Sequence, residues 1–211
     1  MNQLTDGFYA MSMRLLDMLR DRGGAGPGRG RTVLVTSARA GEGKTYVSRM
    51  IASCMAELST DPVLLVDASV ERPSLHMGFG IPNEAGFTDC MTAGAFEQAA
   101  TCAVAPGNLF VLTAGSTLKP GLLFKPQVFE TFLSHSSERF GLVLIDGGTL
   151  ATTGCMPHHV DGVIMVVDSS RTRREVVQGV MGLAKADRNR YLGAVLNKRV
   201  QYIPRSLYRY F

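Results

Sequence analysis

Long apolar runs are missing from this chain of 211 residues. No run reaches the roughly 18 to 20 apolar residues that a membrane-spanning helix needs. Asp6 and polar residues precede the first apolar stretch, which argues against a secretory signal. Cysteine is scarce as well: the four cysteines form no CxxC pair, a pattern typical of free thiols in a reducing compartment. These absences favour a cytoplasmic globular protein with one sizeable core.

Acidic residues become rare towards the C-terminal end of the sequence. From Arg171 onward, ten basic residues stand against two acidic ones, Glu175 and Asp187, while the whole chain carries a net charge of +4. Such a surplus is typical of solvated helix faces. It also suits a surface that meets an anionic lipid, a nucleic acid or an acidic partner. The composition leaves both interpretations open.

Regular patterning is absent at one place, the stretch "RGGAGPGRGR" at 22–31, which is typical of a flexible linker. Before it, apolar residues recur at helical spacing and predict an N-terminal helix within 1–21. After it, alternating apolar segments predict one domain over 32–200. A tyrosine-containing tail at 201–211 completes the predicted organisation.

Short apolar runs divide the domain into strands and helices. The predicted strands are 32–36, 63–67, 109–113, 142–146, 162–167 and 192–197. Most are continuous apolar runs, as expected for strands that are buried on both faces. One-sided apolar stripes predict helices at 45–58 and 173–186. This alternation predicts an α/β fold: a doubly wound, mostly parallel sheet with helices on both faces.

Three polar features follow the predicted strands. The glycine-rich loop "AGEGKT", 40–45, follows the first strand, Asp67 ends the second and Asp146 ends the fourth. The carboxyl ends of parallel strands lie at one edge of a sheet, and ligands bind outside that edge. We therefore expect these three features to form one site.

The glycine loop has the chemistry of a phosphate-binding loop. Gly41 and Gly43 let the backbone turn sharply and approach a ligand without a Cβ in the way. The loop amides can then point inward as an anion cradle, reinforced by the N-terminus of the next helix. Lys44 supplies a positive charge for the β- and γ-phosphates, and Thr45 offers a hydroxyl to Mg²⁺.

Two carboxylates support this interpretation, although the loop is a relaxed form that has Ala38 where the strict motif has glycine. Mg²⁺ prefers hard oxygen ligands and keeps several waters, so one or two acidic residues near the loop suffice. Asp146 and Asp67 fit that need, and either could instead cap a following helix. Together with the loop they predict a Mg²⁺–nucleotide site in which Thr45, Asp67 and Asp146 serve the metal.

Three motifs resemble those of a known family. "VLVTSARAGEGKT", "VLLVDASVERPSLH" and "FGLVLIDGG" are similar to the Walker A, A′ and B motifs of the bacterial tyrosine kinases (BY-kinases). These are MinD/ParA-like P-loop proteins that control capsule and exopolysaccharide synthesis and export. The likeness continues through "GFTDCM", "DGVIMVV" and "LGAVLNK", and it covers roughly residues 30–200.

The resemblance implies a role for each matching residue. Lys44 and Thr45 would hold phosphate and Mg²⁺, and Asp146 would hold the metal through water. Asp67 would lie close to the γ-phosphate and orient or deprotonate an attacking hydroxyl, so the implied catalytic residues are Lys44, Asp67 and Asp146. Asn197 would recognise the base. The implied nucleotide-binding residues are Gly41, Glu42, Gly43, Lys44, Thr45, Tyr46 and Asn197.

The tail resembles that of the family, whereas the A′ motif departs from it. Tyr202, Tyr208 and Tyr210 resemble, in sparse form, the tyrosine cluster that the family autophosphorylates, and they are the candidate phosphorylation sites. The family's A′ motif reads Asp-x-Asp-x-Arg, whereas this sequence has Ser69 in place of the second acid and Glu71 in place of the arginine. A lost charge in a phosphoryl-transfer site lowers the rate more than it lowers nucleotide binding.

Three functions are therefore compatible with the sequence. The first is a cytoplasmic ATP-binding tyrosine autokinase of exopolysaccharide or capsule synthesis, with ATP and Mg²⁺ as cofactors. It would form homo-oligomers and be recruited to the inner face of the membrane by a polysaccharide co-polymerase on a separate chain. The second is a catalytically weak or inactive ATP-dependent assembly switch of the same pathway. The third is a MinD/ParA-type positioning ATPase, although no nucleic acid partner is expected.

Overall fold

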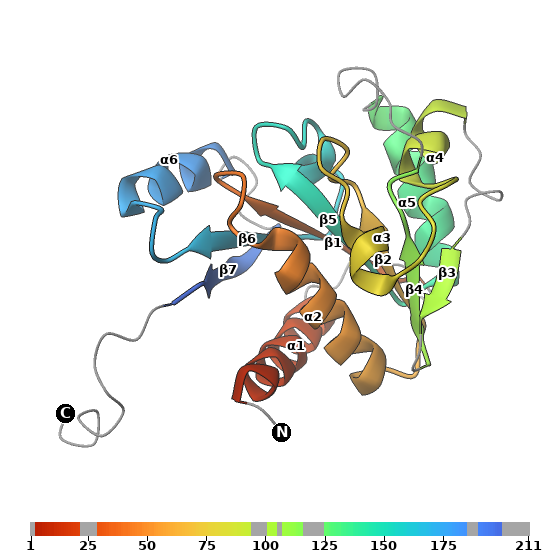
Figure 1. Cartoon of the computed structure of the whole chain (residues 1–211), viewed down its shortest axis with the longest axis horizontal. Coiled ribbons are helices and arrows are strands. Elements are labelled where there is room, and N and C mark those ends of the chain that lie inside the picture. Colours follow the sequence, from red (N-terminus) through yellow and green to blue (C-terminus); the bar gives the residue numbers. More distant parts are fainter. Residues whose placement is uncertain are drawn as a thin grey trace.

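A seven-stranded sheet forms the centre of the computed structural model, which describes residues 3–21, 29–93, 101–104, 107–115, 125–184 and 190–199. The strand order is β3-β4-β2-β5-β1-β6-β7 (Figure 1). The strands are β1 (Arg31–Ser37), β2 (Val63–Asp67), β3 (Thr101–Val104), β4 (Leu109–Leu112), β5 (Leu142–Thr149), β6 (Gly162–Asp168) and β7 (Tyr191–Asn197). Every neighbouring pair is parallel except β3 and β4, which are antiparallel.

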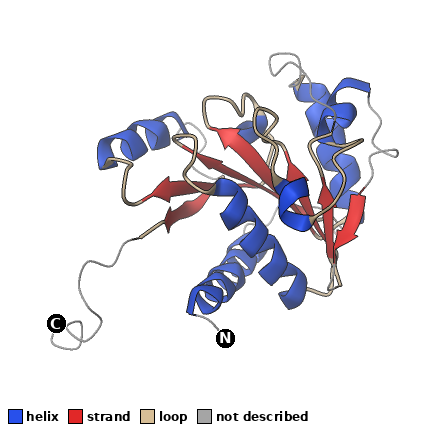
Figure 2. Cartoon of the chain, in the orientation of Figure 1, coloured by secondary structure: helices blue, strands red, loops and turns tan. Residues whose placement is uncertain are grey.

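Helices lie on both sides of this sheet (Figure 2). They are α1 (Gln3–Asp21), α2 (Lys44–Leu58), α3 (Leu75–Phe79), α4 (Phe87–Ala93), α5 (Pro126–Arg139), the 3₁₀ helix η2 (Met156–His158) and α6 (Arg174–Ala184). One core cluster joins α1 and α2 to the sheet, and a second joins α4 and α5 to its other face. The predicted fold class, an α/β sheet covered on both faces, is confirmed.

The alternation of side chains along a strand explains the apolar runs. In β1, Val33 and Val35 belong to the cluster with α1 and α2, whereas Leu34 belongs to the cluster with α4 and α5. Successive side chains point to opposite faces of a sheet. A strand covered on both faces is therefore mostly apolar, because each side chain enters one core or the other.

The N-terminal helix packs against α2. Leu15 and Leu19 of α1 are buried, and the ring of Phe8 meets Tyr46 edge-on with the ring centroids 5.9 Å apart. The helix predicted from apolar spacing is thus present, and its apolar stripe completes the core on this face. Among the helices of the described ranges, none combines the length and apolar character that crossing a membrane requires.

The structure differs from the sequence-based prediction at two strands. β3 was not predicted, and it pairs antiparallel with β4 at one edge of the sheet. The strand predicted to end at Asp146 continues through two glycines to Thr149. Edge strands are short and carry weak apolar signals, and glycine signals a break rather than a strand, so pattern alone predicts neither feature.

Candidate phosphate-binding site

The glycine loop joins β1 to α2 in a conformation that requires glycine. Gly41 (φ 80°) and Gly43 (φ 92°) both adopt left-handed backbone conformations. A residue with a Cβ is strained in this conformation, whereas glycine is not. Helix α2 begins at Lys44, and its N-cap residue, Gly43, provides no side-chain cap. The amides of a first helical turn are the ones that helix geometry leaves without partners. The backbone conformation of the loop and the uncapped start of α2 are compatible with an anion site, and phosphate binding here stays a prediction.

Lys44 lies across the loop. Its Nζ donates a hydrogen bond to Ser37 Oγ at 3.0 Å. Burial lowers the pKa of Lys44 below its ordinary value, and the nearby carboxylates of Asp146 and Glu42 oppose that change. The ammonium group thus sits between the end of β1 and the acids of the site, where it can compensate anionic groups of either a ligand or the protein.

Asp146 is a fully buried carboxyl group in β5. Its Oδ1 accepts a hydrogen bond from Ser48 Oγ at 3.1 Å. Burial raises its pKa to about 7; the neighbouring Asp67 carboxylate raises it too, whereas the Thr45 and Ser48 hydroxyls and the Lys44 ammonium lower it. An acid with this pKa changes its charge near neutral pH, so a bound cation would fix it in the ionised form.

Asp67 lies directly beside Asp146, because the two residues are register partners in the parallel pair of β2 and β5. Both Asp67 oxygens are occupied. Oδ1 accepts the Ser69 amide at 3.1 Å, and Oδ2 accepts the amides of Ser74 and Leu75, each at 3.0 Å. Burial raises the pKa of Asp67, and these backbone donors lower it. Asp67 therefore holds the loop that leads into α3 while standing at the predicted edge.

The remaining loop residues lie at the entrance of α2. Thr45 is half-buried, and its Oγ1 accepts a hydrogen bond from Ser74 Oγ at 3.4 Å. Tyr46 is 46% exposed and packs against Phe8 of α1. The Thr45 hydroxyl is thus on the side of the two acids, whereas the Tyr46 ring is directed towards the N-terminal helix.

One carboxylate oxygen of these acids, unpaired in the described part of the chain, is compatible with a bound hard cation. Asp146 Oδ2 is buried and has no hydrogen-bond partner among the described residues. A buried polar atom without a partner usually has an ordered water or an ion nearby. Mg²⁺ takes oxygen ligands and retains waters, so an Asp146 oxygen with the Thr45 hydroxyl close by fits a magnesium ion that also binds phosphate.

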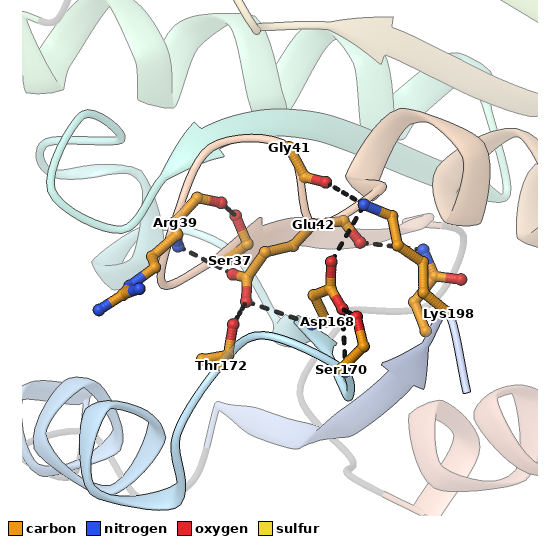
Figure 3. Close-up of polar contacts among 9 residues, drawn as sticks. Ser37, Arg39, Gly41, Glu42, Asp168, Ser170, Thr172 and Lys198 are labelled. Atoms are coloured by element: carbon orange, nitrogen blue, oxygen red, sulfur yellow. Dashed lines mark hydrogen bonds and ion pairs between the residues drawn. The ribbon is translucent and has the colours of Figure 1, made fainter. Parts of the chain in front are cut away.

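Glu42 does not point into the cradle. Its side chain is 2% exposed and is directed towards the end of β6 (Figure 3). Oε2 accepts the backbone amide of Arg39 at 2.8 Å, and Oε1 accepts the amide of Asp168 at 3.2 Å and the hydroxyl of Thr172. The Glu42 carboxylate therefore anchors the loop to the loop after β6, and only its backbone amide is left for a ligand.

Asn197 also contacts the loop. Its Nδ2 donates to the Glu42 carbonyl at 2.9 Å, and a Cβ on Gly43 would lie only 2.1 Å from that nitrogen. The structure thus brings Asn197 to the loop glycine, a contact that the family resemblance did not suggest. Recognition of a base by Asn197 stays a prediction.

Two residues of the site were missed by the sequence analysis. Ser48 is the hydroxyl donor to Asp146, and its position one turn after Lys44 on α2 gives no special signal. Asp168 closes β6 as Asp67 closes β2, and it is buried. The same strand-end rule that selected Asp67 would have found Asp168 after "GVIMVV".

The departures from the A′ motif have visible locations. Ser69 is half-buried and contributes its backbone amide to Asp67, and Glu71 is exposed. The candidate phosphorylation sites Tyr202, Tyr208 and Tyr210 lie outside the described residues, as does most of the predicted linker.

Comparison with known proteins agrees with the resemblance seen in the sequence. No protein-family model matches the chain. The chain is 26% identical over 185 residues to a putative tyrosine-protein kinase, CapB, of Staphylococcus aureus, covering 86% of this chain and 81% of CapB. Further curated relatives from Bacillus subtilis and Streptococcus, 24 to 27% identical, are also named tyrosine-protein kinases. The suspected relationship to bacterial tyrosine kinases is confirmed at this level of similarity.

Solved structures support the fold. The kinase domain of VpsO has a TM-score of 0.74 and 24% identity, with 92% of this chain and 96% of that domain covered. MinD from Pyrococcus horikoshii, solved with Mg-ADP, has a TM-score of 0.65 and 20% identity, with 84% and 75% covered. At these identities the likeness shows a MinD-like P-loop fold.

Proposed function

We propose that this chain is an ATP-binding, protein-tyrosine autokinase-like regulator of exopolysaccharide or capsule synthesis and export. It acts in the cytoplasm with a membrane co-polymerase partner on a separate chain and assembles into homo-oligomers. The observation that carries the proposal is a left-handed glycine loop at an uncapped helix start together with two buried register-partner acids, Asp67 and Asp146. The tyrosine-kinase relatives favour ATP and protein tyrosine as the substrates.

The loop and Lys44 bind the phosphates of the nucleotide. Backbone amides at the start of α2 donate to phosphate oxygens, and Lys44 Nζ leaves Ser37 to meet the β- and γ-phosphates. Mg²⁺, when bound, neutralises charge on the transferring phosphoryl group. Thr45 and the Oδ2 oxygen of Asp146 would hold the metal or its water, with Asp146 in its ionised form.

Asp67 takes the proton from, or orients, the tyrosine hydroxyl in this proposal. Its raised pKa makes it a stronger base than a solvated aspartate. The acceptors are Tyr202, Tyr208 and Tyr210 of a neighbouring subunit. Asn197 recognises the nucleotide base in this proposal, while its Nδ2 keeps its hydrogen bond to the Glu42 carbonyl of the loop.

A second function, a nucleotide-dependent assembly switch without tyrosine transfer, is favoured by one specific observation. Both oxygens of Asp67 already accept backbone amides, and Ser69 brings no second carboxylate to the same place. An Asp67 that already accepts three amides is less available as a base, whereas nucleotide binding by the loop is unaffected. The partner would then respond to the bound nucleotide rather than to phosphotyrosine.

Incubation of the purified protein with γ-labelled ATP and Mg²⁺ separates the two functions. The experiment is run with and without the cytoplasmic segment of the partner, and label on protein and free phosphate are counted separately. The autokinase predicts label that disappears in the Tyr202→Phe/Tyr208→Phe/Tyr210→Phe variant and in Lys44→Met. Lys125→Met, at an exposed lysine before α5, is the matched control and keeps the label. Absence of label with the partner segment present would falsify the autokinase, and label-free, Lys44-dependent ATP binding would support the switch.

A further inference from the structure

Lys198 makes two contacts that join the phosphate loop to the ends of two strands. Its Nζ donates to the Gly41 carbonyl at 2.6 Å and to Asp168 Oδ2 at 3.1 Å (Figure 3). Asp168 is itself fixed, because its Oδ1 accepts the amide and hydroxyl of Ser170. These donors hold the pKa of Asp168 at about 2 despite its burial. Lys198 is thus tied to a carboxylate that stays charged.

The backbone of Lys198 is unusual. Its φ of 54° is the only positive φ of a non-glycine residue in the described part of the chain. Residues in this region are strained and persist only where the surroundings fix them. Lys198 follows Asn197, whose Nδ2 holds the next carbonyl of the loop, that of Glu42. Two consecutive side chains therefore bind two consecutive carbonyls of the phosphate loop.

Holding a carbonyl also orients the amide that follows it. In a planar trans peptide the C=O of one residue and the N–H of the next point in opposite directions. When Lys198 holds the Gly41 carbonyl, the Glu42 amide is directed to the other side of the loop. When Asn197 holds the Glu42 carbonyl, the Gly43 amide is directed in the same way. These are amides of the predicted anion cradle.

We propose that Lys198 is a positioning residue of the nucleotide site: together with Asn197 it fixes the carbonyls of Gly41 and Glu42, so that the loop amides face the phosphates before a nucleotide arrives. The proposal rests on the proposed nucleotide binding and adds a residue that acts through the loop rather than on the ligand. A glycine loop has many conformations to lose on binding, and prior fixation reduces that loss and raises affinity.

Asn197 and Lys198 hold the loop by different kinds of contact. Asn197 docks against Gly43 at a distance that excludes any Cβ, so its position is set by packing. The side chain of Lys198 is 45% exposed, and only its charged ammonium group contacts the loop, through a hydrogen bond to the Gly41 carbonyl. Loss of the Lys198 ammonium releases the Gly41 carbonyl and removes the ion pair to Asp168. Asp168 keeps its two hydrogen bonds from Ser170, so a variant at the lysine position should still fold.

Titration of Mg-ADP into four proteins tests the proposal: wild type, Lys198→Met, Lys198→Arg and Arg199→Met. Arg199 is the matched control, because it is the next residue, is basic and is exposed. We expect Lys198→Met to raise the Kd about tenfold, the scale of one charge-assisted hydrogen bond. Lys198→Arg should recover most of the affinity, and Arg199→Met should change it less than about twofold. Adenosine, which lacks phosphates, should bind wild type and Lys198→Met equally.

Backbone NMR relaxation of the nucleotide-free proteins provides a readout that does not depend on binding. The order parameters of the Glu42 and Gly43 amides should be lower in Lys198→Met than in wild type, with those of helix α2 unchanged. Equal loss of affinity in Lys198→Met and Arg199→Met would indicate general charge attraction and overturn the proposal, as would unchanged order parameters at these amides. If wild type bound no nucleotide, the proposed function would fail, and the relaxation measurement alone would still decide whether Lys198 fixes the loop.

Discussion

Asp67 and Asp146 lie side by side on β2 and β5, yet their surroundings differ in kind. Asp67 receives three backbone amides from the segment between β2 and α3. Asp146 accepts no backbone amide in the described residues: Ser48 donates a hydroxyl to Oδ1, the Thr45 hydroxyl lies close enough to lower its pKa, and the buried Oδ2 has no hydrogen-bond partner there. The first carboxyl group is held by backbone donors of its own loop, and the second keeps an oxygen that could serve a cation.

The comparison shows how position in a strand affects the chemistry of an acid. Asp67 is the last residue of β2, so the chain that follows can turn back and offer its amides. Asp146 is followed by three more residues of β5, and its strand carries the backbone away from the carboxyl group. Two acids that look equivalent as strand-end residues are therefore a structural anchor and a candidate metal ligand.

The largest effect is expected from pH at Asp146. The pKa of this group rises from its ordinary 3.8 to about 7 in the fold, so the folded protein holds the proton more tightly than the unfolded chain. Stability from this group is therefore greatest below pH 4 and falls as pH rises towards 7. Relative to Asp146→Asn, wild type should lose about 3 kcal/mol of unfolding free energy between pH 5 and pH 8.

Urea denaturation of wild type and Asp146→Asn at pH 5, 6, 7 and 8 measures this difference. The asparagine keeps an acceptor for Ser48 and cannot ionise, which makes it the matched reference. A constant gap between the two proteins across this range would contradict the assignment. Saturating Mg²⁺ and nucleotide should reduce the pH dependence, because the cation stabilises the ionised carboxylate.

A smaller effect is expected from Asp67→Ala. This substitution leaves three amides without their acceptor, and the Leu75 amide is buried. Unsatisfied buried donors are costly, so the unfolding free energy should fall by about 2 to 3 kcal/mol. Asp67→Asn retains one acceptor and should lose less.

Denaturation at pH 7 quantifies both Asp67 variants, and hydrogen exchange localises the change. Faster exchange is expected at Ser74 and Leu75, at the start of α3. If Asp67→Ala were as stable as wild type, the carboxyl group would not be the anchor that its hydrogen bonds indicate, and the contrast with Asp146 would disappear.

The smallest effect on unfolding free energy is expected from two serines that contact the two acids through different groups. Ser48 donates its hydroxyl to Asp146, whereas Ser69 donates its backbone amide to Asp67. Ser48→Ala removes a buried hydrogen bond and should cost about 1 kcal/mol. Ser69→Ala keeps the amide and should change the unfolding free energy by less than about 0.5 kcal/mol.

Thermal or urea unfolding of the two serine variants, measured side by side, tests this pair. Ser48→Ala should also shift the pH dependence of the Asp146 contribution to higher pH, because the Ser48 hydroxyl lowers the pKa of that acid. Equal losses in both variants would show that the two serines act through the same kind of contact, against the geometry.

Pattern in the sequence was sufficient for much of the fold, and it selected the residues at the centre of the candidate site. The predicted strands that became β1, β2, β5 and β6 are buried on both faces, and that demand produces continuous apolar runs. The edge strand β3 does not have to be apolar on both faces, and the sequence pattern did not predict it. Gly41, Gly43 and Lys44 were recognisable because a phosphate cradle restricts residue type at each position.

Contacts between distant segments could not be read in the same way. Glu42 looks like a ligand residue because it lies inside the loop, but its carboxylate turns to Asp168 and Thr172, more than 120 residues away. Lys198 lies 157 residues from Gly41 and contacts its carbonyl. No local pattern encodes such pairs, since a single buried acid or exposed lysine has many possible partners.

The sequence by itself determined the alternation of strands and helices, the glycine loop and the placement of acids after apolar runs, because burial and backbone conformation limit which residues can stand at those positions. The tertiary structure alone decided which acid has an oxygen without a partner in the described residues, which acid accepts three backbone amides, and which side chains hold the loop. These outcomes depend on hydrogen-bond partners that the folded sheet brings within about 3 Å, and such partners come from parts of the chain whose separation carries no local signal.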